Sequence, residues 1–324
     1  MEITLNNIRA AAERIRGIAC QTPLKPAYTL SEKSGRNVWL KMENMQPTGA
    51  FKLRGAANAI LQLSPAQRQA GVLTMSTGNH GKAIAYVAKK LGMRAVICIS
   101  EQVPEVKIQG MKKLGVEVRV AGKDQDEADI QARAMAQDEG LCFISAFDDA
   151  GVIAGQGTVA LEVLEQEPDI DTMIIPLSGG GLMAGMGIAA KSMKPNIELI
   201  GVTMEHGAAM HLSIQAGHLV EVEEKPSLAD ALTGGIPADN QYSFPLCQQF
   251  VDRSFLVSEE SIAEAMAYAL RWERIVLEGG AATSIACLDK YLAEIPGQNI
   301  ALICTGDNVA VPKLVDIFHQ HIKA

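Results

Sequence analysis

The sequence predicts an α/β protein with two open, mostly parallel twisted sheets and flanking helices. Short apolar runs alternate with helical patterns through most of the chain, which is typical of βαβ units. The 324 residues exceed the length, roughly 250–300 residues, at which a single core stops growing, so two domains are expected. Polar and glycine-rich segments follow several of the apolar runs, where parallel sheets bind ligands.

The elements follow one another in a regular order. Residues 2–18 have the spacing of an amphipathic surface helix with a cap near Asn6, and a helix opens at 54–60 after a turn at Pro47 and Gly49. A first series then has strands at 71–76, 94–100, 116–122 and 142–147, separated by helices at 80–92, 105–115 and 126–140. A second series has helices at 157–167 and 181–194 and strands at 172–178, 196–205 and 299–308.

The two series indicate two domains. We expect a small domain at residues 53–148, inserted into a large domain formed by residues 1–52 and 149–324. The segment 207–240 is less regular than the rest, and no internal repeat is visible.

Composition excludes several classes of function. The net charge is −8 and no basic stripe with aromatics is present, which argues against a nucleic-acid partner. No run approaches 18 apolar residues, so no membrane span is expected, and the N-terminus lacks the apolar run of a signal peptide, so the cytoplasm is the expected location. The six cysteines are scattered without a C-x-x-C pair, which predicts neither a zinc site nor a disulfide scaffold.

Two segments with turn and helix-cap chemistry raise the question of a ligand. The segment "QPTGAFKLRGAANAI" places Lys52 and Arg54 at a helix start, where the helix dipole favours anions; the ordinary interpretation is two solvated cations. The segment "STGNHG", Ser76–Gly81, joins a strand to a helix and can offer several donors to an anion. Its simpler interpretation is a helix cap.

Two further strand ends admit more than one interpretation. "SGGGLMAG", Ser178–Gly185, lets backbone amides approach a phosphate at a helix N-terminus. Gly179, Gly181 and Ala184 also satisfy G-x-G-x-x-A, with Glu205 about twenty residues on, so a nicotinamide-dependent dehydrogenase is an alternative. The structural interpretation of this segment is that its glycines only permit tight packing. The other strand end is "CTGDN", Cys304–Asn308, whose structural interpretation is a plain turn. Pyridoxal phosphate is one ligand that would use all four segments, because its aldehyde reacts with a lysine amine.

The motifs "TGAFKLRGA", "STGNHG", "IAGQGT" (Ile153–Thr158), "SGGGLMAG" and "CTGDN" together resemble those of the fold-type II pyridoxal-phosphate enzymes, which have a tryptophan-synthase-β-like fold. Within this group the chain is similar to the serine/threonine dehydratase and serine racemase family over nearly its whole length. "MEHGAAM" (Met204–Met210) and "LADALTGGI" (Leu228–Ile236) resemble signatures of the branch for ectoine and hydroxyectoine utilisation.

The resemblance implies a set of site residues. Lys52 would carry pyridoxal 5'-phosphate through a Schiff base and later take the α-proton, and Thr77 stands where racemases place a serine that acts on the opposite face. The remaining cofactor residues implied are Phe51 beside the ring, Asn79 at the ring hydroxyl, Ser178, Gly179, Gly180, Gly181 and Leu182 at the phosphate, Glu278 near the ring and Thr305 at the pyridine nitrogen. The substrate carboxylate would be held by Ser76, Thr77, Gly78, Asn79 and His80.

The resemblance also implies an activity. The expected enzyme is a homodimeric pyridoxal-phosphate-dependent ammonia-lyase that converts threonine, serine or a related ectoine-pathway amino acid into a 2-oxo acid and ammonia. An amino-acid racemase on the same scaffold, a nicotinamide-dependent dehydrogenase and a non-catalytic amino-acid sensor are the alternatives. Thr203 and Ala209 stand where the racemase branch has carboxylates, so no activating metal is expected there. Asp307 replaces a usual glycine and leaves the surroundings of the ring nitrogen open.

Overall fold

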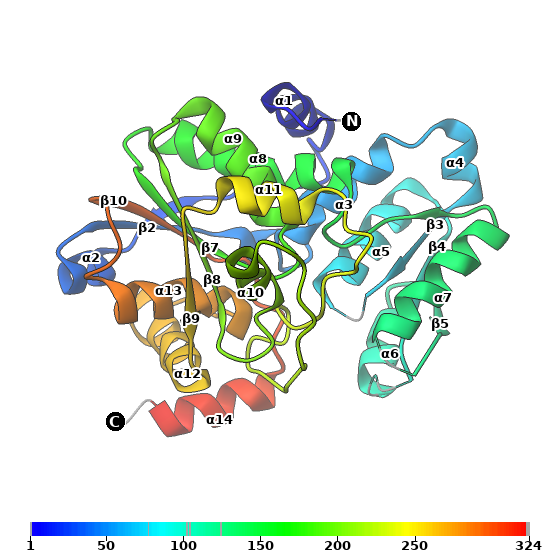
Figure 1. Cartoon of the computed structure of the whole chain (residues 1–324). Coiled ribbons are helices and arrows are strands. Elements are labelled where there is room, and N and C mark those ends of the chain that lie inside the picture. The colour runs from blue at the N-terminus through cyan, green and yellow to red at the C-terminus, as the bar shows by residue number, and fades with distance from the viewer. Residues whose placement is uncertain (1, 77, 102, 104, 124, 322–324) are drawn as a thin grey trace.

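The structure is a computed structural model that describes residues 2–76, 78–101, 103, 105–123 and 125–321. It contains two sheets that lie side by side in two lobes (Figure 1). Thr77, predicted at the substrate site, lies outside the described residues.

The larger sheet has six strands, and all neighbours except the first pair are parallel. Their order across the sheet is β1 (Leu24–Pro26), β2 (Asn37–Lys41), β10 (Asn299–Ile303), β7 (Thr172–Pro176), β8 (Glu198–Met204) and β9 (Arg253–Val257). The smaller sheet is fully parallel, in the order β5 (Glu117–Val120), β4 (Ala95–Ile99), β3 (Val72–Met75) and β6 (Cys142–Phe143). The predicted fold class is therefore confirmed.

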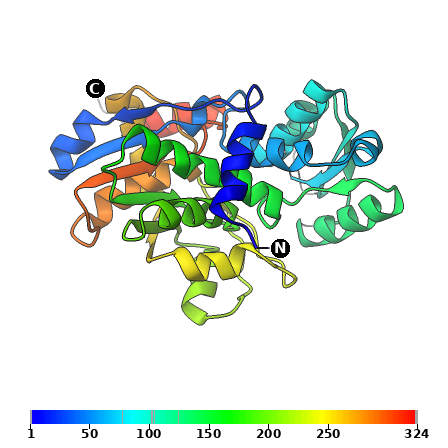
Figure 2. The same cartoon turned by 90° about the horizontal axis from the view of Figure 1, so that it is seen from above.

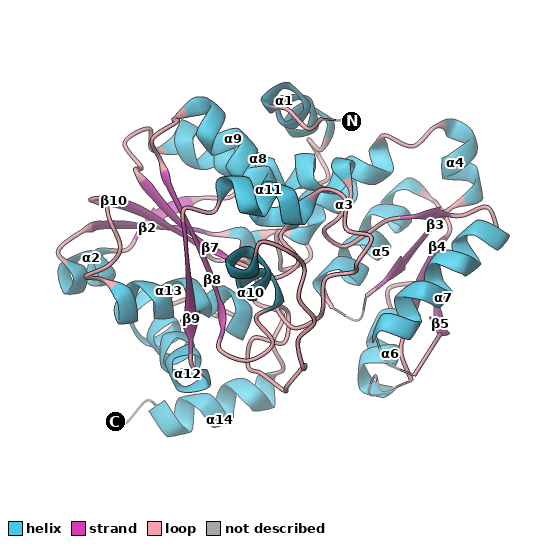
Figure 3. Cartoon of the chain, in the orientation of Figure 1, coloured by secondary structure: helices cyan, strands magenta, loops and turns pink. Residues whose placement is uncertain are grey.

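Helices cover both faces of each sheet, as parallel sheets require (Figure 3). We call the smaller sheet and its helices the small lobe; these helices are α4 (Pro65–Ala70), α5 (Asn79–Leu91), α6 (Glu105–Lys112) and α7 (Gln125–Asp138). The large lobe comprises the larger sheet with α1 (Leu5–Arg14), α2 (Tyr28–Ser34), α8 (Ala150–Gln166), α9 (Gly181–Met193), α10 (Ala209–Ala216), α11 (Ser243–Phe250), α12 (Glu259–Tyr268), α13 (Gly279–Tyr291), α14 (Val311–His321), the 3₁₀ turn η1 (Glu43–Met45) and the π-helix η2 (Ala269–Glu273). The helix α3 (Lys52–Leu61) packs on both α5 and α8 and so joins the lobes.

The core of the large lobe has two layers because alternate residues of each strand point to opposite faces. Along β7, Ile174 packs with α12 and α13, whereas Met173 and Ile175 pack with α8 and α9 on the other face. All three side chains are fully buried, which explains the continuous apolar run that marked this strand in the sequence. Seen from above, α1 lies between the lobes (Figure 2).

Most predicted elements occur within a few residues of their expected limits, but four local predictions were wrong. The helix expected at 157–167 begins at Ala150, because the Asp149 carboxylate accepts a hydrogen bond of 2.8 Å from the Val152 amide and caps it. Thr4, not Asn6, caps α1, and α3 begins at Lys52 rather than at residue 54. The strand expected at 142–147 ends at Phe143, and the chain beyond it forms a loop.

Candidate active site

A cavity of about 560 Å³ lies where the two lobes meet. Its walls come from the carboxyl ends of β3, β7 and β10 and from the start of α3, which are the positions that the motifs occupy. Every predicted site residue that the structure describes lines it: Phe51, Lys52, Ser76, Gly78, Asn79, His80, Ser178, Gly179, Gly180, Gly181, Leu182, Glu278 and Thr305.

Lys52 is held at the cavity by backbone contacts of the two residues before it. The Phe51 amide donates to the Thr305 carbonyl (3.0 Å), and Ala50 forms a bridge with Gly306, so the start of α3 is fixed against the end of β10. The Lys52 Nζ donates to the Ala146 carbonyl at 2.6 Å and lies 5.2 Å from the centre of the Phe51 ring. Burial lowers the pKa of Lys52 to about 8, so a neutral, nucleophilic amine is accessible near neutral pH.

The glycine loop after β7 is a candidate anion site of the cavity. Gly180 has φ 87° and is the N-cap of α9, whose first turn has free amides and no acidic side chain. A Cβ on Gly179 would lie 2.5 Å from the Phe147 ring, and a Cβ on Gly180 would lie 2.7 Å from the Cys247 Sγ. Only glycine therefore fits at these two positions, and the backbone amides stay open to a phosphate.

The segment Ser76–Gly81 supplies polar groups from the small lobe. The Ser76 Oγ accepts hydrogen bonds from the amides of Gly78 (3.3 Å) and Gly81 (3.1 Å) and so shapes the turn before α5. His80 is only 2% exposed, its Nε2 lies 3.3 Å from the Ile144 carbonyl, and its Nδ1 has no hydrogen-bond partner among the described residues. Burial, aided by the Lys52 charge, lowers the pKa of His80 to about 3, so its ring is neutral.

Glu278 and Thr305 line the cavity from the large lobe. Both are 3% exposed, and the Glu278 Oε1 accepts a hydrogen bond of 2.8 Å from the Asn79 Nδ2. Burial raises the pKa of Glu278 to about 7, with Asp230 and Asp307 adding to the effect. The Asp307 carboxylate lies against Gly49, and Asp307 does not line the cavity, so it does not face the Thr305 side of the site.

The raised pKa of Glu278 predicts a pH-dependent stability. Because the folded state binds this proton more tightly, the stabilisation is present below about pH 4.5 and is lost as the pH rises through about 7. Relative to wild type, Glu278→Gln is expected to gain about 3 kcal/mol of unfolding free energy across this window, at about 1.4 kcal/mol per pKa unit. Urea unfolding from pH 5 to 8 measures the difference, and a constant offset would contradict the prediction.

Arg54 is the clearest correction to the sequence interpretation, because it is not solvated. It is 1% exposed and forms two bonds of 2.7 Å to Glu43, from Nε and Nη2, and two to Glu162, from Nη1 (2.5 Å) and Nη2 (2.8 Å). The Lys41 Nζ donates to the Glu162 Oε2 at 2.6 Å, so two cations face two carboxylates. This cluster fixes α3 to β2, η1 and α8 behind Lys52. The sequence predicted a role for Lys52 but not the ion pairs of Arg54, because Glu43 and Glu162 are not its neighbours in sequence.

The cavity has further lining residues that were not among the predicted site residues. Lys82 on α5 and Asn308 after β10 line the cavity, and so do Asp129 and Arg133 of α7, whose side chains pair at 2.6 Å. The segment 230–235 lines it as well.

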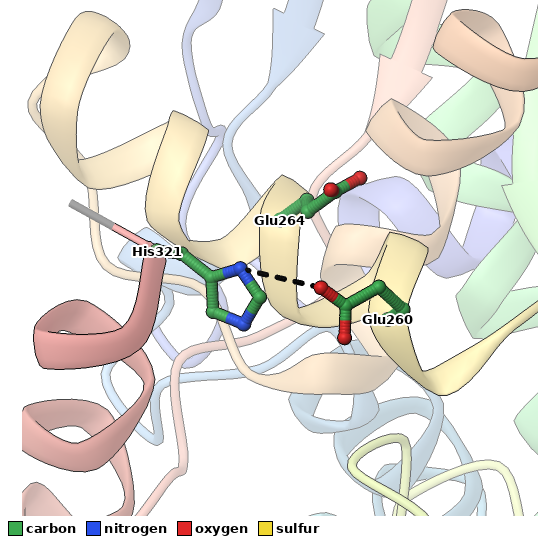
Figure 4. Close-up of side chains that lie close together, drawn as sticks. All are labelled: Glu260, Glu264 and His321. Atoms are coloured by element: carbon green, nitrogen blue, oxygen red, sulfur yellow. Dashed lines mark ion pairs between the residues drawn. The ribbon is translucent and has the colours of Figure 1, made fainter. Parts of the chain in front are cut away.

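One group of side chains could ligate a metal among the residues that the structure describes. Glu260 and Glu264, one turn apart on α12, and His321 at the end of α14 have ligand atoms within 4.8 Å of one another (Figure 4). The His321 Nδ1 lies 3.7 Å from a Glu260 oxygen, and both glutamates are exposed. None of the three lines the cavity.

The structure does not place the acidic residue that the dehydrogenase alternative requires at the cavity. Glu205, which would have to reach a ribose, instead lies 3.3 Å from the Lys290 Nζ and does not line the cavity. The buried lysine amine beside the glycine loop, which that alternative leaves unused, fits pyridoxal phosphate. The open amides of α9 suit its phosphate, and the unpartnered His80 Nδ1 offers a further polar contact.

Comparison with known proteins gives the same result. The family model described as "Pyridoxal-phosphate dependent enzyme" matches residues 15–306. A protein of Sinorhizobium fredii, provisionally named a threonine dehydratase, is 46% identical and covers 95% of this chain and 92% of its own. The L-threonine ammonia-lyase of Thermotoga maritima is 38% identical, covering 98% and 79% of the two chains. The structure of maize serine racemase superposes with a TM-score of 0.90, at 29% identity, over 99% and 98% of the chains.

Proposed function

Because the chain belongs to the family of pyridoxal-phosphate dependent enzymes, we propose that it is a lyase of the threonine dehydratase type. It would convert L-threonine, or L-serine, into the 2-oxo acid and ammonia. The observation that carries the proposal is the Lys52 amine, buried at the cavity between the glycine loop and the segment Ser76–Gly81. The relatives named for threonine dehydration support this reaction over the others that the fold could perform.

Each wall of the cavity has one task in this proposal. The glycine loop and the N-terminus of α9 would hold the phosphate, Thr305 would bind at the pyridine nitrogen, and Asn79 would bind at the ring hydroxyl; all of these line the cavity. Ser76, Gly78 and His80 would hold the substrate carboxylate. Pyridoxal phosphate, when bound, supplies a conjugated ring that takes up the electron pair released when the α-proton leaves.

Lys52 has two tasks. It would hold the cofactor in the absence of substrate and, once released, its Nζ would accept the α-proton of the amino acid. Proton transfer by a positioned amine requires its neutral form, which the lowered pKa of about 8 makes accessible. The neutral hydroxyl of Thr305 does not stabilise a proton on the ring nitrogen as a carboxylate would, which favours loss of the β-hydroxyl.

Two finer features of the proposal concern specificity and assembly. The similarity of Met204–Met210 and Leu228–Ile236 to the ectoine-utilisation branch makes a related 2,4-diamino acid a further candidate substrate, since segment 230–235 lines the cavity.

We also propose that the chain forms a homodimer in the cytoplasm, with domains divided at 52/53 and 148/149. Every helix of the described residues is too short or too polar to cross a bilayer.

The proposed reaction is tested by product analysis. The purified holoenzyme is expected to release a 2-oxo acid from L-threonine and L-serine, detected with lactate dehydrogenase or a hydrazine, in preference to the D-isomers. Formation of D-serine or D-threonine faster than the 2-oxo acid would favour the racemase. A panel that includes 2,4-diamino acids shows which side chain is preferred, and no product from any of these amino acids would contradict the proposal.

A further inference from the structure

A chain of hydrogen bonds crosses the cavity from a cation to a carboxyl group. The Lys82 Nζ donates to the Asn308 Oδ1 at 2.8 Å, the Asn308 Nδ2 donates to the Asn79 Oδ1 at 2.7 Å, and the Asn79 Nδ2 donates to the Glu278 Oε1 at 2.8 Å. Lys82 and Asn79 belong to α5 of the small lobe, whereas Asn308 and Glu278 belong to the large lobe. The chain therefore spans the two lobes at the cavity.

The cation and the Thr48 carbonyl together fix the direction of the bonds in this chain. An ammonium group only donates, so Asn308 must turn its oxygen toward Lys82. The Asn308 Nδ2 then points away from Lys82, and its two hydrogens go to the Thr48 carbonyl (2.9 Å) and to the Asn79 oxygen. Both ends of the Asn308 amide are thus used, and a turned amide would place its nitrogen against the ammonium group.

The same logic continues to Asn79. Since its oxygen accepts from Asn308, its nitrogen is the end that faces Glu278 and the cavity. The Asn79 Nδ2 carries two hydrogens, of which Glu278 takes one. The second hydrogen is available to an oxygen atom in the cavity, and an amide turned the other way would present an acceptor there.

We propose that Asn308, oriented by Lys82, is a positioning residue that holds the Asn79 amide with its N–H groups toward the oxygen of the cofactor ring. This inference rests on the proposed role of Asn79 at the ring hydroxyl. A ring oxygen that bears negative charge accepts hydrogen bonds, so a donor at Asn79 stabilises the cofactor and an acceptor repels it. Asn308 itself does not need to contact the cofactor or the substrate.

Two substitutions of Asn308 separate orientation from simple packing. In Asn308→Asp the carboxylate still pairs with Lys82 but only accepts, so Asn79 turns its nitrogen toward Asp and its oxygen toward the cavity. In Asn308→Leu the contact is lost, and Asn79 can take either orientation. The apparent dissociation constant for pyridoxal phosphate is therefore expected to rise most in Asn308→Asp and less in Asn308→Leu. The rise in Asn308→Asp should be about tenfold or more, because the Asn79 oxygen would then face the ring oxygen and both only accept. A purely structural role predicts comparable weakening in the two variants, because neither side chain can donate to the Thr48 carbonyl.

The experiment uses the full-length holoenzyme and titrates each cofactor-depleted variant with pyridoxal phosphate, recording absorbance. The absorption maximum and the pH at which the band shifts provide a second readout that does not depend on turnover. Lys82→Met, which removes the cation, should move the band in the same direction as Asn308→Asp but by less, because the Thr48 carbonyl still accepts from the Asn308 Nδ2. Asn37→Asp is the matched control, since Asn37 also bonds an asparagine, Asn299, but on the exposed surface.

The outcomes separate the inference from the proposed function. The inference is supported if Asn308→Asp binds the cofactor most weakly, Asn308→Leu binds it with intermediate affinity and wild type binds it most tightly, with a shifted absorption band in the variants. Equal binding in all forms, comparable weakening in the two variants, or weaker binding in Asn308→Leu than in Asn308→Asp overturns it. If Asn79→Ala itself leaves cofactor binding and the band unchanged, the proposed role of Asn79 is wrong and the inference fails with it. A strong effect of Asn79→Ala with none in Asn308→Asp overturns the inference alone.

Discussion

Lys52→Ala is expected to lower the rate of 2-oxo acid formation by at least about 10³-fold, because it removes both the covalent attachment of the cofactor and the proton acceptor. The Lys52 amine lines the cavity and burial lowers its pKa, and no other lysine lies at the start of α3. Steady-state assays with L-threonine measure the loss. Lys90→Ala, at an exposed position on α5, is the matched lysine control and should retain wild-type activity.

The chemical readout of this prediction is independent of turnover. Treatment of the wild-type holoenzyme with borohydride, followed by digestion and mass spectrometry, should locate a pyridoxyl adduct on Lys52. The same treatment of Lys52→Ala should yield no adduct. An adduct on another residue of the wild type would remove the basis of the proposed function.

Arg54→Met is expected to destabilise the fold by about 3–5 kcal/mol, the usual cost of leaving a buried carboxylate without its partner. Arg54 and Glu43 are 1% and 0% exposed, and Arg54 also binds Glu162. The free energy of unfolding from urea titration measures this loss. Because the cluster fixes α3, the variant should also bind the cofactor less tightly.

A double-mutant cycle distinguishes a lost ion pair from lost packing. Arg54→Met with Glu43→Met removes one charge of each sign and leaves Lys41 paired with Glu162, so it should recover part of the stability. Arg119→Met is the surface control, since Arg119 also binds two glutamates, Glu117 and Glu139, but in solvent. We expect it to have a much smaller effect. If both arginine variants lose equal stability, burial of the Arg54 cluster is not the cause.

The local motifs were predictable because each depends on neighbouring residues. The strand at Thr172–Pro176 follows from its apolar run, and the helix start at the glycine loop follows from its consecutive glycines. The start of α8 was predicted too late in the chain. The Asp149 cap starts the helix at Ala150, although the glycine-rich residues that follow have only a weak helical pattern. The prediction that the strand continues beyond Phe143 was also wrong, because the polar atoms of this segment face a cavity that the sequence does not reveal.

The sequence by itself determined the two-sheet α/β class, the lysine, the glycine loop and the polar strand ends. These depend on hydrophobic period and on the conformations that glycine permits, and both are local properties of the chain. Only the tertiary structure decided the partners: Arg54 became a buried ion-pair centre, and Glu278 acquired its raised pKa opposite Asn79. The physical reason is that burial and charge pairing act between residues that are far apart in sequence, such as Asn79 and Glu278, and they are brought together only when the lobes fold.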